Sequence, residues 1–528
     1  MRRPRPGDSG WAWVLSIAWR GSVYHWTSRA IRLEGPQSRY VGLVSIDPIP
    51  ERLSLRGTPS LPEISVSVSW PSSAPVADGV ASGFSLVGSE AQVSLVPSSS
   101  PGVGSWSDRL VVVRGLIENP LWGAVDEPVS FAIVRYEDHD RSSWPPAGWR
   151  VTEYTWPISR TVVAPPGMPE IDTLTTYTDP ELGTSYPVPF GTPGVGYRPS
   201  VGETSVPAVP AIVVDKSGDN VDRLLVCGGT PEATSLTLWY LDTDDAWGTV
   251  SKTIEKGTDA LGQPVGTVDI SSDVSAVRTA QEYRTSWAGG GVLLPGRTTT
   301  ARGAGQLALW WLWRSGIPLD VPSSLSAGGE LDGYRLDGWL EEPTSASEWL
   351  ADRVFGALPA FLATSADGSK YVRSVRWQAT IADSRAKLTE GDGTVRRSDR
   401  VETIGDGRAR TIIVRWGWSR STDGYAWTTY RYVDGVADET PVEIVAELPD
   451  VYQGSTAELV AQWLAWREGA PRDRLRVQAS TARWGWLSAG DVVTYSESRL
   501  SMVDRVCLVE SIQRTDQPWT EIELLPVR

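Results

Sequence analysis

The chain has 528 residues and a net charge of −15, with 41% hydrophobic and 21% charged residues. An ordinary apolar content and 27 Trp exclude a disordered chain, and no apolar run approaches the roughly 18 residues that span a bilayer. The negative balance argues against a protein that grips nucleic acid over its whole surface, because phosphate contacts need a positive face. At about 150 residues per domain, the length predicts three or four domains.

The N-terminal region predicts β-structure. Arg residues precede the apolar stretch 11–19 as in a secretory signal, but Pro and Gly interrupt the join and no small-residue cleavage site follows. The stretch instead has the period of two that is typical of a strand. Alternation continues to residue 154, most clearly at 64–70, between Pro-, Ser- and Gly-rich loops at 71–83 and 97–107.

The middle of the chain mixes strands, loops and helices. Residues 165–210 are dense in Pro, Gly and Thr, which predicts an extended connector on a surface, and residues 211–280 return to strands. Apolar residues at helical spacing predict three helices, over 301–314, 345–355 and 456–467. The remainder from residue 410 is expected to form strands.

One pattern occurs near both ends of the chain. The segments 86–95 and 487–495 each place a Leu, a small residue and an acid ahead of a strand. Each is followed by a strand that leads to a turn with Pro and Trp and then by a final strand, over 109–133 and 505–525. A duplicated domain explains this pattern, and so does a chance likeness between β-rich sequences.

Scarce residue types limit the possible chemistry. Only His25 and His139 are present, which excludes multi-His metal sites and argues against a His-dependent triad. Cys227 and Cys507 lie in apolar runs far apart in sequence, and we interpret them as buried small hydrophobes rather than as a disulfide. The chain has 5 Lys against 44 Arg, a bias that a GC-rich genome explains as well as fixed interface contacts do.

No motif builds a catalytic site. The Gly-Asp-Ser-Gly of 7–10 resembles a protease nucleophile motif but has no base, and the G-x-G-x-x-A of 303–308 lacks the strand that a dinucleotide site needs. The acidic runs 137–140 and 242–245 lack the distal Glu of a calcium loop, and the adjacent acids 341–342 point in different directions. We therefore predict no catalytic, cofactor-binding or metal-binding residue.

The abundance of Trp has two interpretations, because Trp stacks on sugar rings and is also enriched in cores and subunit interfaces. Composition does not separate them. A large, β-rich, acidic chain without a catalytic site is most simply a structural or assembly component.

Several stretches resemble phage tail hub proteins. The helix and its exit at 305–320, the sequel at 331–350 and the C-terminal segments 456–467 and 484–493 are similar to such hubs, as is the opening strand pair 11–24. The likeness covers most of the chain and is weakest in the loop segment.

The resemblance implies the hub of a tail tip or baseplate, a homotrimer in which each chain supplies two tube-like β-barrel domains. Three chains then present six barrels, which adapts a sixfold tail tube to a threefold spike or central fibre. The implied partners are the tail tube or distal tail protein, the central spike or fibre protein and a tape measure protein. The implied location is the distal end of the tail in the virion, without enzymatic activity, a cofactor, a membrane span or sequence-specific nucleic acid binding.

On this basis we expect a mainly β fold with a smaller α/β middle region. The expected domains are a first tube-like barrel, a loop-rich connector with a β-rich inserted domain, a mixed helical/β middle domain and a second tube-like barrel, over 1–155, 156–280, 281–405 and 406–528. An acidic bore would let DNA slide through.

Two other functions remain open from the residues. One is a secreted β-rich carbohydrate-binding protein or a glycoside hydrolase, which would hold two carboxyls about 5–10 Å apart across a cleft. The other is a receptor-binding tail fibre, although fibres usually show long repeats and none is present in the sequence.

Overall fold

A computed structural model describes residues 11–527 except 35–38, 54–63, 69–81, 84, 100–102, 123–127, 136–142, 145–147, 153, 157–182, 193–208, 288, 292, 294–301, 315–318, 320–328, 341–343, 365–368, 398–401, 405–408, 420–423, 434–441, 470–471 and 516–517. The fold is mainly β, with 56% of the described residues in strands and 14% in helices, and it contains a closed barrel and a nearly closed one. The predicted fold class is therefore confirmed.

The first barrel is a closed sheet of seven strands. Its order is β1-β2-β4-β6-β10-β9-β7, and β7 pairs back onto β1. The strands are Trp11–Trp19 (β1), Ser22–Thr27 (β2), Arg39–Ile46 (β4), Ile64–Val68 (β6), Glu90–Ser99 (β7), Leu110–Trp122 (β9) and Val129–Arg135 (β10), with short extensions Arg32–Glu34 (β3) and Val103–Ser105 (β8). Inward residues of β1 such as Trp13, Leu15 and Ile17 fill the interior, which confirms the strand predicted for this stretch.

The second, nearly closed barrel has the strand order β25-β32-β33-β34-β31-β26, with β27 also on β31. Its strands are Ala386–Thr389 (β25), Val395–Arg397 (β26), Glu402–Ile404 (β27), Arg472–Ser480 (β31), Val492–Glu497 (β32), Met502–Arg514 (β33) and Trp519–Pro526 (β34). The sheet thus begins before the expected boundary at residue 406. Its interior is a separate cluster that includes Val477, Cys507 and Leu524.

The two barrels share one substructure. The run β7, β9, β10 and the run β32, β33, β34 are both antiparallel meanders of consecutive neighbours. Before each run, a glycine with φ of +78° or +83° closes a tight turn, at Gly88 and Gly490. Gly88 N donates to Ile117 O at 2.9 Å, and Gly490 N donates to Val509 O at 2.7 Å. This shared geometry supports the duplication interpretation of the repeated pattern.

A β-sandwich follows the first barrel in the chain. One sheet has the order β13-β20-β16-β17 and the other β14-β15-β19-β18. The elements are Val209–Pro210 (β13), Ile212–Ser217 (β14), Asn220–Gly228 (β15), Ser235–Leu241 (β16), Trp247–Thr253 (β17), Glu255–Thr258 (β18), Pro264–Asp269 (β19), Ser275–Arg278 (α2) and Glu282–Trp287 (β20).

The middle region confirms the three predicted helices. They are Ala304–Arg314 (α3), Ala346–Leu350 (α5) with a π-helical continuation Ala351–Phe355, and Gly454–Glu468 (α6). They accompany the hairpin Ala360–Thr364 (β23) and Lys370–Ser374 (β24), the pairs Ser143–Trp144 (β11) with Thr344–Ser345 (β22) and Val188–Phe190 (β12) with Gly338–Leu340 (β21), and the sheet Gly424–Tyr432 (β29), Ala409–Ser419 (β28) and Val442–Leu448 (β30).

Many Trp side chains lie in the core of this middle region. Trp311 of α3 stacks on Trp349 of α5 at 5.1 Å between ring centroids, and Trp463 stacks on Trp466 within α6 at 5.2 Å. Trp311 and Trp463 are fully buried. For these residues, the core-packing interpretation of the Trp content is confirmed.

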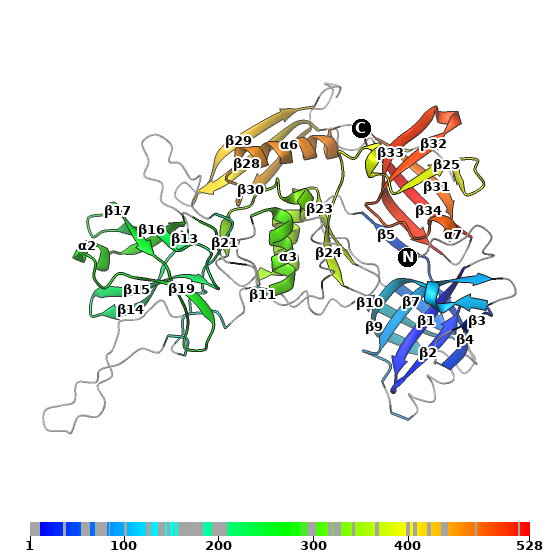
Figure 1. Ribbon diagram of the computed structural model, residues 1–528, viewed down its shortest axis with the longest axis horizontal. Coiled ribbons are helices and arrows are strands. Elements are labelled where there is room, and N and C mark those ends of the chain that lie inside the picture. The colour runs from blue at the N-terminus through cyan, green and yellow to red at the C-terminus, as the bar shows by residue number, and fades with distance from the viewer. Residues whose placement is uncertain are drawn as a thin grey trace.

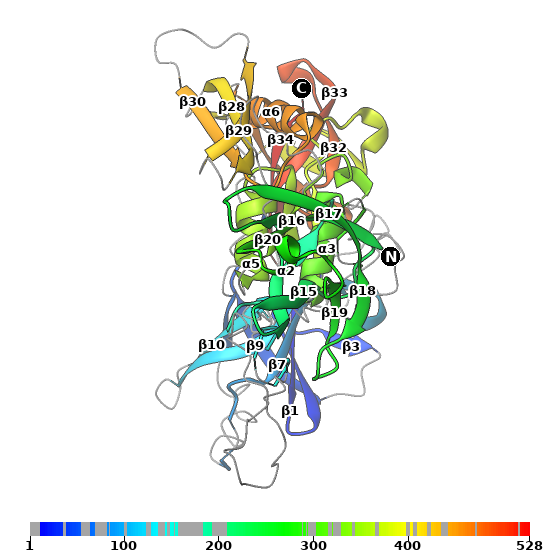
Figure 2. The ribbon, with the colours of Figure 1, turned by 90° about the vertical axis from the view of Figure 1, so that its left-hand side faces the viewer.

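The two barrels lie together at one end of the long axis and the β-sandwich at the other, with the helices and their sheets between them (Figure 1). Seen from the sandwich end, the sandwich stands in front of the rest (Figure 2). One further strand, Ile49–Arg52 (β5), lies between the two barrels (Figure 1).

Candidate functional site

The described part of each rejected motif has a structural explanation. Residues 303–308 begin α3, where Ala304 and Ala308 are fully buried, which confirms close helix packing. Asp242 lies in the β16–β17 turn and its carboxylate accepts the backbone N–H groups of Asp244 and Ala246 at 2.9 Å. The motifs at 7–10, 137–140 and 341–342, His139 and most of the loop segment 165–210 lie outside the described residues.

The Cys and His residues that the structure describes are buried. Cys227 and Cys507 are free thiols, as predicted, and burial raises the pKa of each to about 12. His25 Nδ1 lies 2.8 Å from Ser16 Oγ, and burial lowers its pKa to about 4, with a further lowering from Arg109. His25 is therefore neutral at pH 7 and packs as part of the first barrel.

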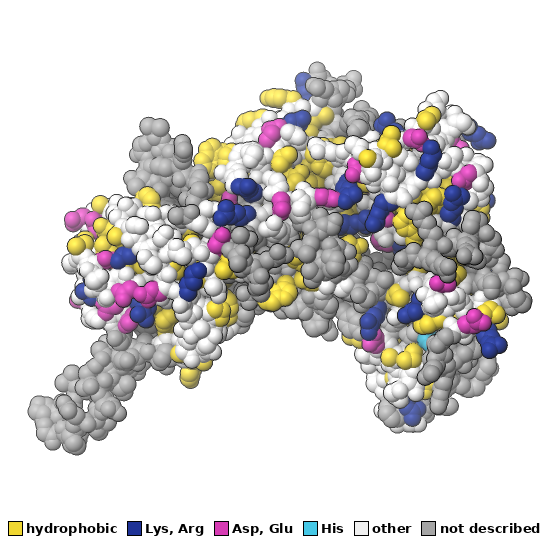
Figure 3. Space-filling model, viewed as in Figure 1, with side chains coloured by type: hydrophobic (Ala, Val, Ile, Leu, Met, Phe, Trp, Pro, Cys, Tyr) yellow, Lys and Arg dark blue, Asp and Glu magenta, His cyan; other side chains and the backbone are white. Residues whose placement is uncertain are grey.

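Within the described ranges, no group of three or more His, Cys, Asp or Glu could hold a metal ion. Nor does any helix described by the structure combine the length and hydrophobicity that crossing a bilayer requires. On the face shown in Figure 3, the basic and acidic side chains of the described residues are interspersed.

The junction between the barrels holds a network of buried polar side chains. Strand Ile49–Arg52 (β5) follows β4 of the first barrel but pairs antiparallel with β33 of the second, with Ile49 opposite Arg514 and Arg52 opposite Ser511. Ile49 packs in the core of the first barrel, and Leu53 packs in the large core of the middle region. One short strand thus joins three parts of the molecule.

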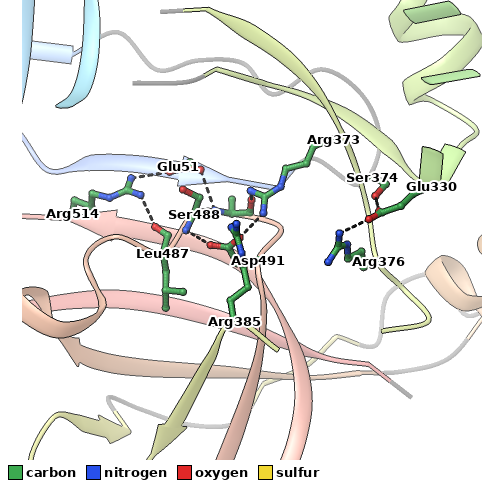
Figure 4. Close-up of polar contacts among 11 residues, drawn as sticks. Glu51, Glu330, Arg373, Ser374, Arg376, Arg385, Leu487, Ser488, Asp491 and Arg514 are labelled. Atoms are coloured by element: carbon green, nitrogen blue, oxygen red, sulfur yellow. Dashed lines mark hydrogen bonds and ion pairs between the residues drawn. The ribbon is translucent and has the colours of Figure 1, made fainter. Parts of the chain in front are cut away.

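Glu51 of β5 fixes the strand on the second barrel (Figure 4). Its Oε2 accepts Nη1 of Arg514 at 2.8 Å, and its Oε1 accepts the backbone N–H of Ala489 at 3.0 Å. Arg514 is buried and also donates to the carbonyls of Gly485 at 3.1 Å and Leu487 at 2.6 Å. A planar guanidinium with its donors directed at fixed acceptors holds one orientation, which a Lys in its place would not.

Asp491 holds the other side of the same turn. Its side chain is 1% exposed, and Oδ1 accepts Arg373 Nη2 at 2.5 Å and Arg385 Nη1 at 2.6 Å. Its Oδ2 accepts the backbone N–H of Ser488 at 2.8 Å. Burial lowers the pKa of Arg373, but Asp491, Tyr371 and Glu51 together outweigh burial and the net shift is upward. Because Arg373 belongs to β24, the ion pair ties the middle region to the second barrel.

The hairpin β23–β24 approaches this turn closely. A Cβ at Gly490 would lie 2.8 Å from Cζ of Phe361, so the glycine is required for space as well as for its positive φ. At the end of β24, Glu330 accepts hydrogen bonds from Ser374 and Arg376 (Figure 4). Buried ions with several directed partners contribute more to a defined geometry than to stability, because desolvation offsets most of the attraction. The junction therefore holds β5 and the hairpin β23–β24 in defined positions on the second barrel.

A pair of Asp residues lies between β21 and the loop after β30, with Asp337 buried and the Asp450 side chain 19% exposed. Asp337 N donates to Asp450 O at 2.7 Å, and Asp337 Oδ1 accepts Thr192 N at 2.7 Å. Burial raises the pKa of both carboxyls to about 6. Arg353 lies 3.8 Å from Asp450 and opposes this rise. The pair connects the sandwich side of the molecule to the α6 sheet.

Sequence reasoning did not identify the junction residues. The one signal in the sequence was the repeated pattern before each meander. When Gly88 is aligned with Gly490, Asp491 corresponds to Ser89, so the second barrel has a charged residue where the first has an uncharged one. That hydrogen-bonded alignment pairs Leu86 with Ser488, one residue away from the Leu-to-Leu pairing that the sequence alone suggests.

No protein-family model and no curated protein matches the sequence. A tail protein from Neisseria meningitidis MC58 is 10% identical with a TM-score of 0.41, over 97% of this chain and 96% of that chain. The 43 kDa tail protein of prophage MuSo2 from Shewanella oneidensis is 10% identical with a TM-score of 0.36, over 98% of each chain. A chain of the virion of a native gene transfer agent is 14% identical with a TM-score of 0.37, over 58% of this chain and 77% of that chain.

Phage tail, baseplate and gene-transfer-agent virion proteins are thus the class of solved structures to which the chain is similar. This class agrees with the resemblance found in the sequence.

Proposed function

We propose that the chain is a structural virion protein, the hub of a phage tail tip or baseplate, and that it forms a homotrimer. The observation that carries the proposal is the pair of barrels with the same meander and the same glycine turn, joined through β5. Three copies place six similar barrels around a threefold axis, so one face can meet a sixfold tube while the other meets a threefold spike or fibre.

The mechanism of such a hub is geometric. The six barrels match a sixfold ring only if the two barrels within a chain keep the angle that the ring requires. Glu51 and Arg514 supply that constraint by fixing β5, the strand that follows β4 of the first barrel, on the second barrel. Asp491 adds to it by holding the same turn of the second barrel to the middle region. A flexible linker of the same length would leave the angle free.

The partners that follow from this role are the tail tube or distal tail protein, the central spike or fibre protein and a tape measure protein, at the distal end of the tail. The net charge of −15 supports a bore that DNA passes without sticking, because carboxylates give phosphates nothing to bind. A bore lined mainly by Arg in the assembled ring would contradict this part of the proposal.

The test is the mass and shape of the purified chain. Light scattering is expected to give three times the 57.4 kDa of one chain, and class averages in electron microscopy are expected to show six densities around a channel. A monomer at all concentrations, or a ring with three densities, would overturn the hub.

One observation favours carbohydrate binding as a second candidate function. On the sheet β13-β20-β16-β17, the register places Trp239 on the same face as Arg284 and Thr249, and Trp247 lies two residues before Thr249. Both Trp are partly exposed, and Trp239 Nε1 donates to Ser286 Oγ at 3.1 Å. A monomer that binds soluble oligosaccharides, and loses them on Trp239→Ala, would favour this function over the hub.

A further inference from the structure

The shared substructure of the barrels allows their surfaces to be compared residue by residue. The two glycine hydrogen bonds pair Ile117 with Val509. Near this point each strand has a bulge in its pairing with the next strand. On β9 the bulge lies between Glu118, opposite Ala132 of β10, and Leu121, opposite Ser130. On β33 it is at Glu510, between the residues opposite Leu524 and Glu523 of β34. Counting along the strands then pairs residues 119–122 of β9 with residues 511–514 of β33.

In the second barrel, this surface is covered. On one side β33 pairs with β34. On its other side it pairs with β32 as far as Leu508, opposite the first residue of β32, and then with β5 at residues 511–514. The adjoining turn residue Ala489 is 2% exposed and donates its N–H to Glu51 of β5. The first barrel of the same chain supplies this covering strand.

In the first barrel, the corresponding surface is open among the residues that the structure describes. β9 pairs with β10 on one side. On the other side β7 begins opposite Leu116, and none of the strands that the structure describes pairs with β9 beyond that residue. Val87, which corresponds to Ala489, is 54% exposed, and Leu121, which corresponds to Gln513, is 70% exposed. A Cβ at Gly88 would meet no atom within 4 Å, whereas one at Gly490 would meet Phe361.

We propose that this open surface, defined by Val87, Leu121 and the free side of β9 beyond Leu116, binds a second copy of the chain. The inference rests on the proposed trimer. In a ring of alternating barrels, each barrel has a neighbour on the same side, so the contact made on the second barrel within a chain recurs on the first barrel between chains. Exposed apolar residues at that place are what such an interface buries.

Chain order also names the surface on the neighbouring copy. Along the sequence, β5 comes between β4 and β6 of the first barrel. The strands of the second barrel that correspond to β4 and β6 are β26 and β31. The segment between those two holds β28, β29, β30 and α6. On this sheet, Ile413 lies between Tyr430 and Val445, on the face opposite to Arg431, which pairs with Glu458 of α6.

That face, away from α6, carries the most exposed aromatic side chains of the segment between β26 and β31. Tyr430 is 60% exposed, Tyr432 is 72% exposed and Val445 is 45% exposed. Because Pro120 has no N–H, β9 cannot repeat the full strand ladder that β5 makes on β33. The contact between copies therefore depends on packing of these apolar side chains against Val87 and Leu121.

The experiment measures the trimer–monomer equilibrium of the full chain by light scattering over a concentration series. Leu121→Asp, Val87→Asp and Tyr430→Asp are each expected to weaken association at least tenfold, which corresponds to about 1.4 kcal/mol. Leu261→Asp is the matched control, because Leu261 is 60% exposed in the turn between β18 and β19 of the distant sandwich. Circular dichroism melting of each variant checks that the fold is retained.

The outcomes separate this inference from the proposed function. If the wild-type chain is trimeric and the Leu121→Asp and Val87→Asp variants associate as tightly as Leu261→Asp, the surface is wrong and the hub stands. If Tyr430→Asp alone has no effect, the surface on the neighbouring copy is wrong. A wild-type chain that is monomeric throughout overturns the trimer and this interface together.

Discussion

Removing the carboxylate of Asp491 tests whether the ion cluster holds the second barrel to the middle region. In Asp491→Ala, Arg373 loses its buried partner and Ser488 N loses its acceptor, while Arg373 keeps its 2.6 Å hydrogen bond to the Ala489 carbonyl. Arg385 returns to solvent, because its side chain is already 58% exposed.

The expected size follows from these exposures. Breaking a buried ion pair by removing one partner costs about 3–5 kcal/mol. Arg373 is 17% exposed and keeps one acceptor, so the lower end applies, about 3 kcal/mol. Removing the exposed partner in Arg385→Ala should cost no more than about 1 kcal/mol. Asp491→Asn keeps an acceptor for Ser488 N and should fall between the two.

Differential scanning calorimetry of the full chain measures these effects as shifts in the transition that contains the second barrel. A loss of about 3 kcal/mol corresponds to a lower midpoint by about 6–12 °C for a unit of 150 to 250 residues. Arg385→Ala serves as the control on the same cluster. If Asp491→Ala leaves every midpoint unchanged, or if Arg385→Ala shifts it equally, Asp491 does not hold the junction.

Three further predictions concern stability. In thermal unfolding, Gly490→Ala should destabilise the chain by about 1–3 kcal/mol more than Gly88→Ala. Both substitutions strain a positive φ, but only a Cβ at Gly490 would meet Phe361. Equal losses of stability would contradict this comparison of the two turns. Burial raises the pKa of Asp337 to about 6, so the folded chain keeps a proton that the unfolded chain releases, and stability falls as the pH rises from 4 to 7. Asp337→Asn should flatten that slope in melts at pH 5 and pH 7.5. Burial lowers the pKa of His25 to about 4, so stability should fall as the pH drops from 6.5 to 4, and a His25 ring that titrates near 6.5 by NMR would refute its burial.

Local patterns in the sequence determined much of the secondary structure. The alternation of residues 11–19 specifies β1, and apolar residues at helical spacing specify α3 and α6. These predictions succeed because a strand or helix that buries one face needs the same periodicity wherever it packs. The apolar runs around the two Cys residues likewise indicated their burial.

The partners of each element were decided only by the tertiary structure. Nothing in residues 49–52 indicates that β5 pairs with residues 511–514 rather than with its own barrel, because periodicity specifies which face is buried and not which strand lies alongside. The same reason explains why the second barrel recruits β25 and β26 from before residue 406.

The candidate site shows the same division. The sequence supplied the repeated turn and, in Asp491, a charged residue where the first barrel has Ser89. The structural role of Asp491 depends on Arg373 and Arg385, which lie more than 100 positions away in the sequence. They reach the turn only when the middle region has packed against the second barrel. A carboxylate in a turn is ordinarily solvated, and it becomes a structural ion pair here because packing removes the water and brings both guanidinium groups to it.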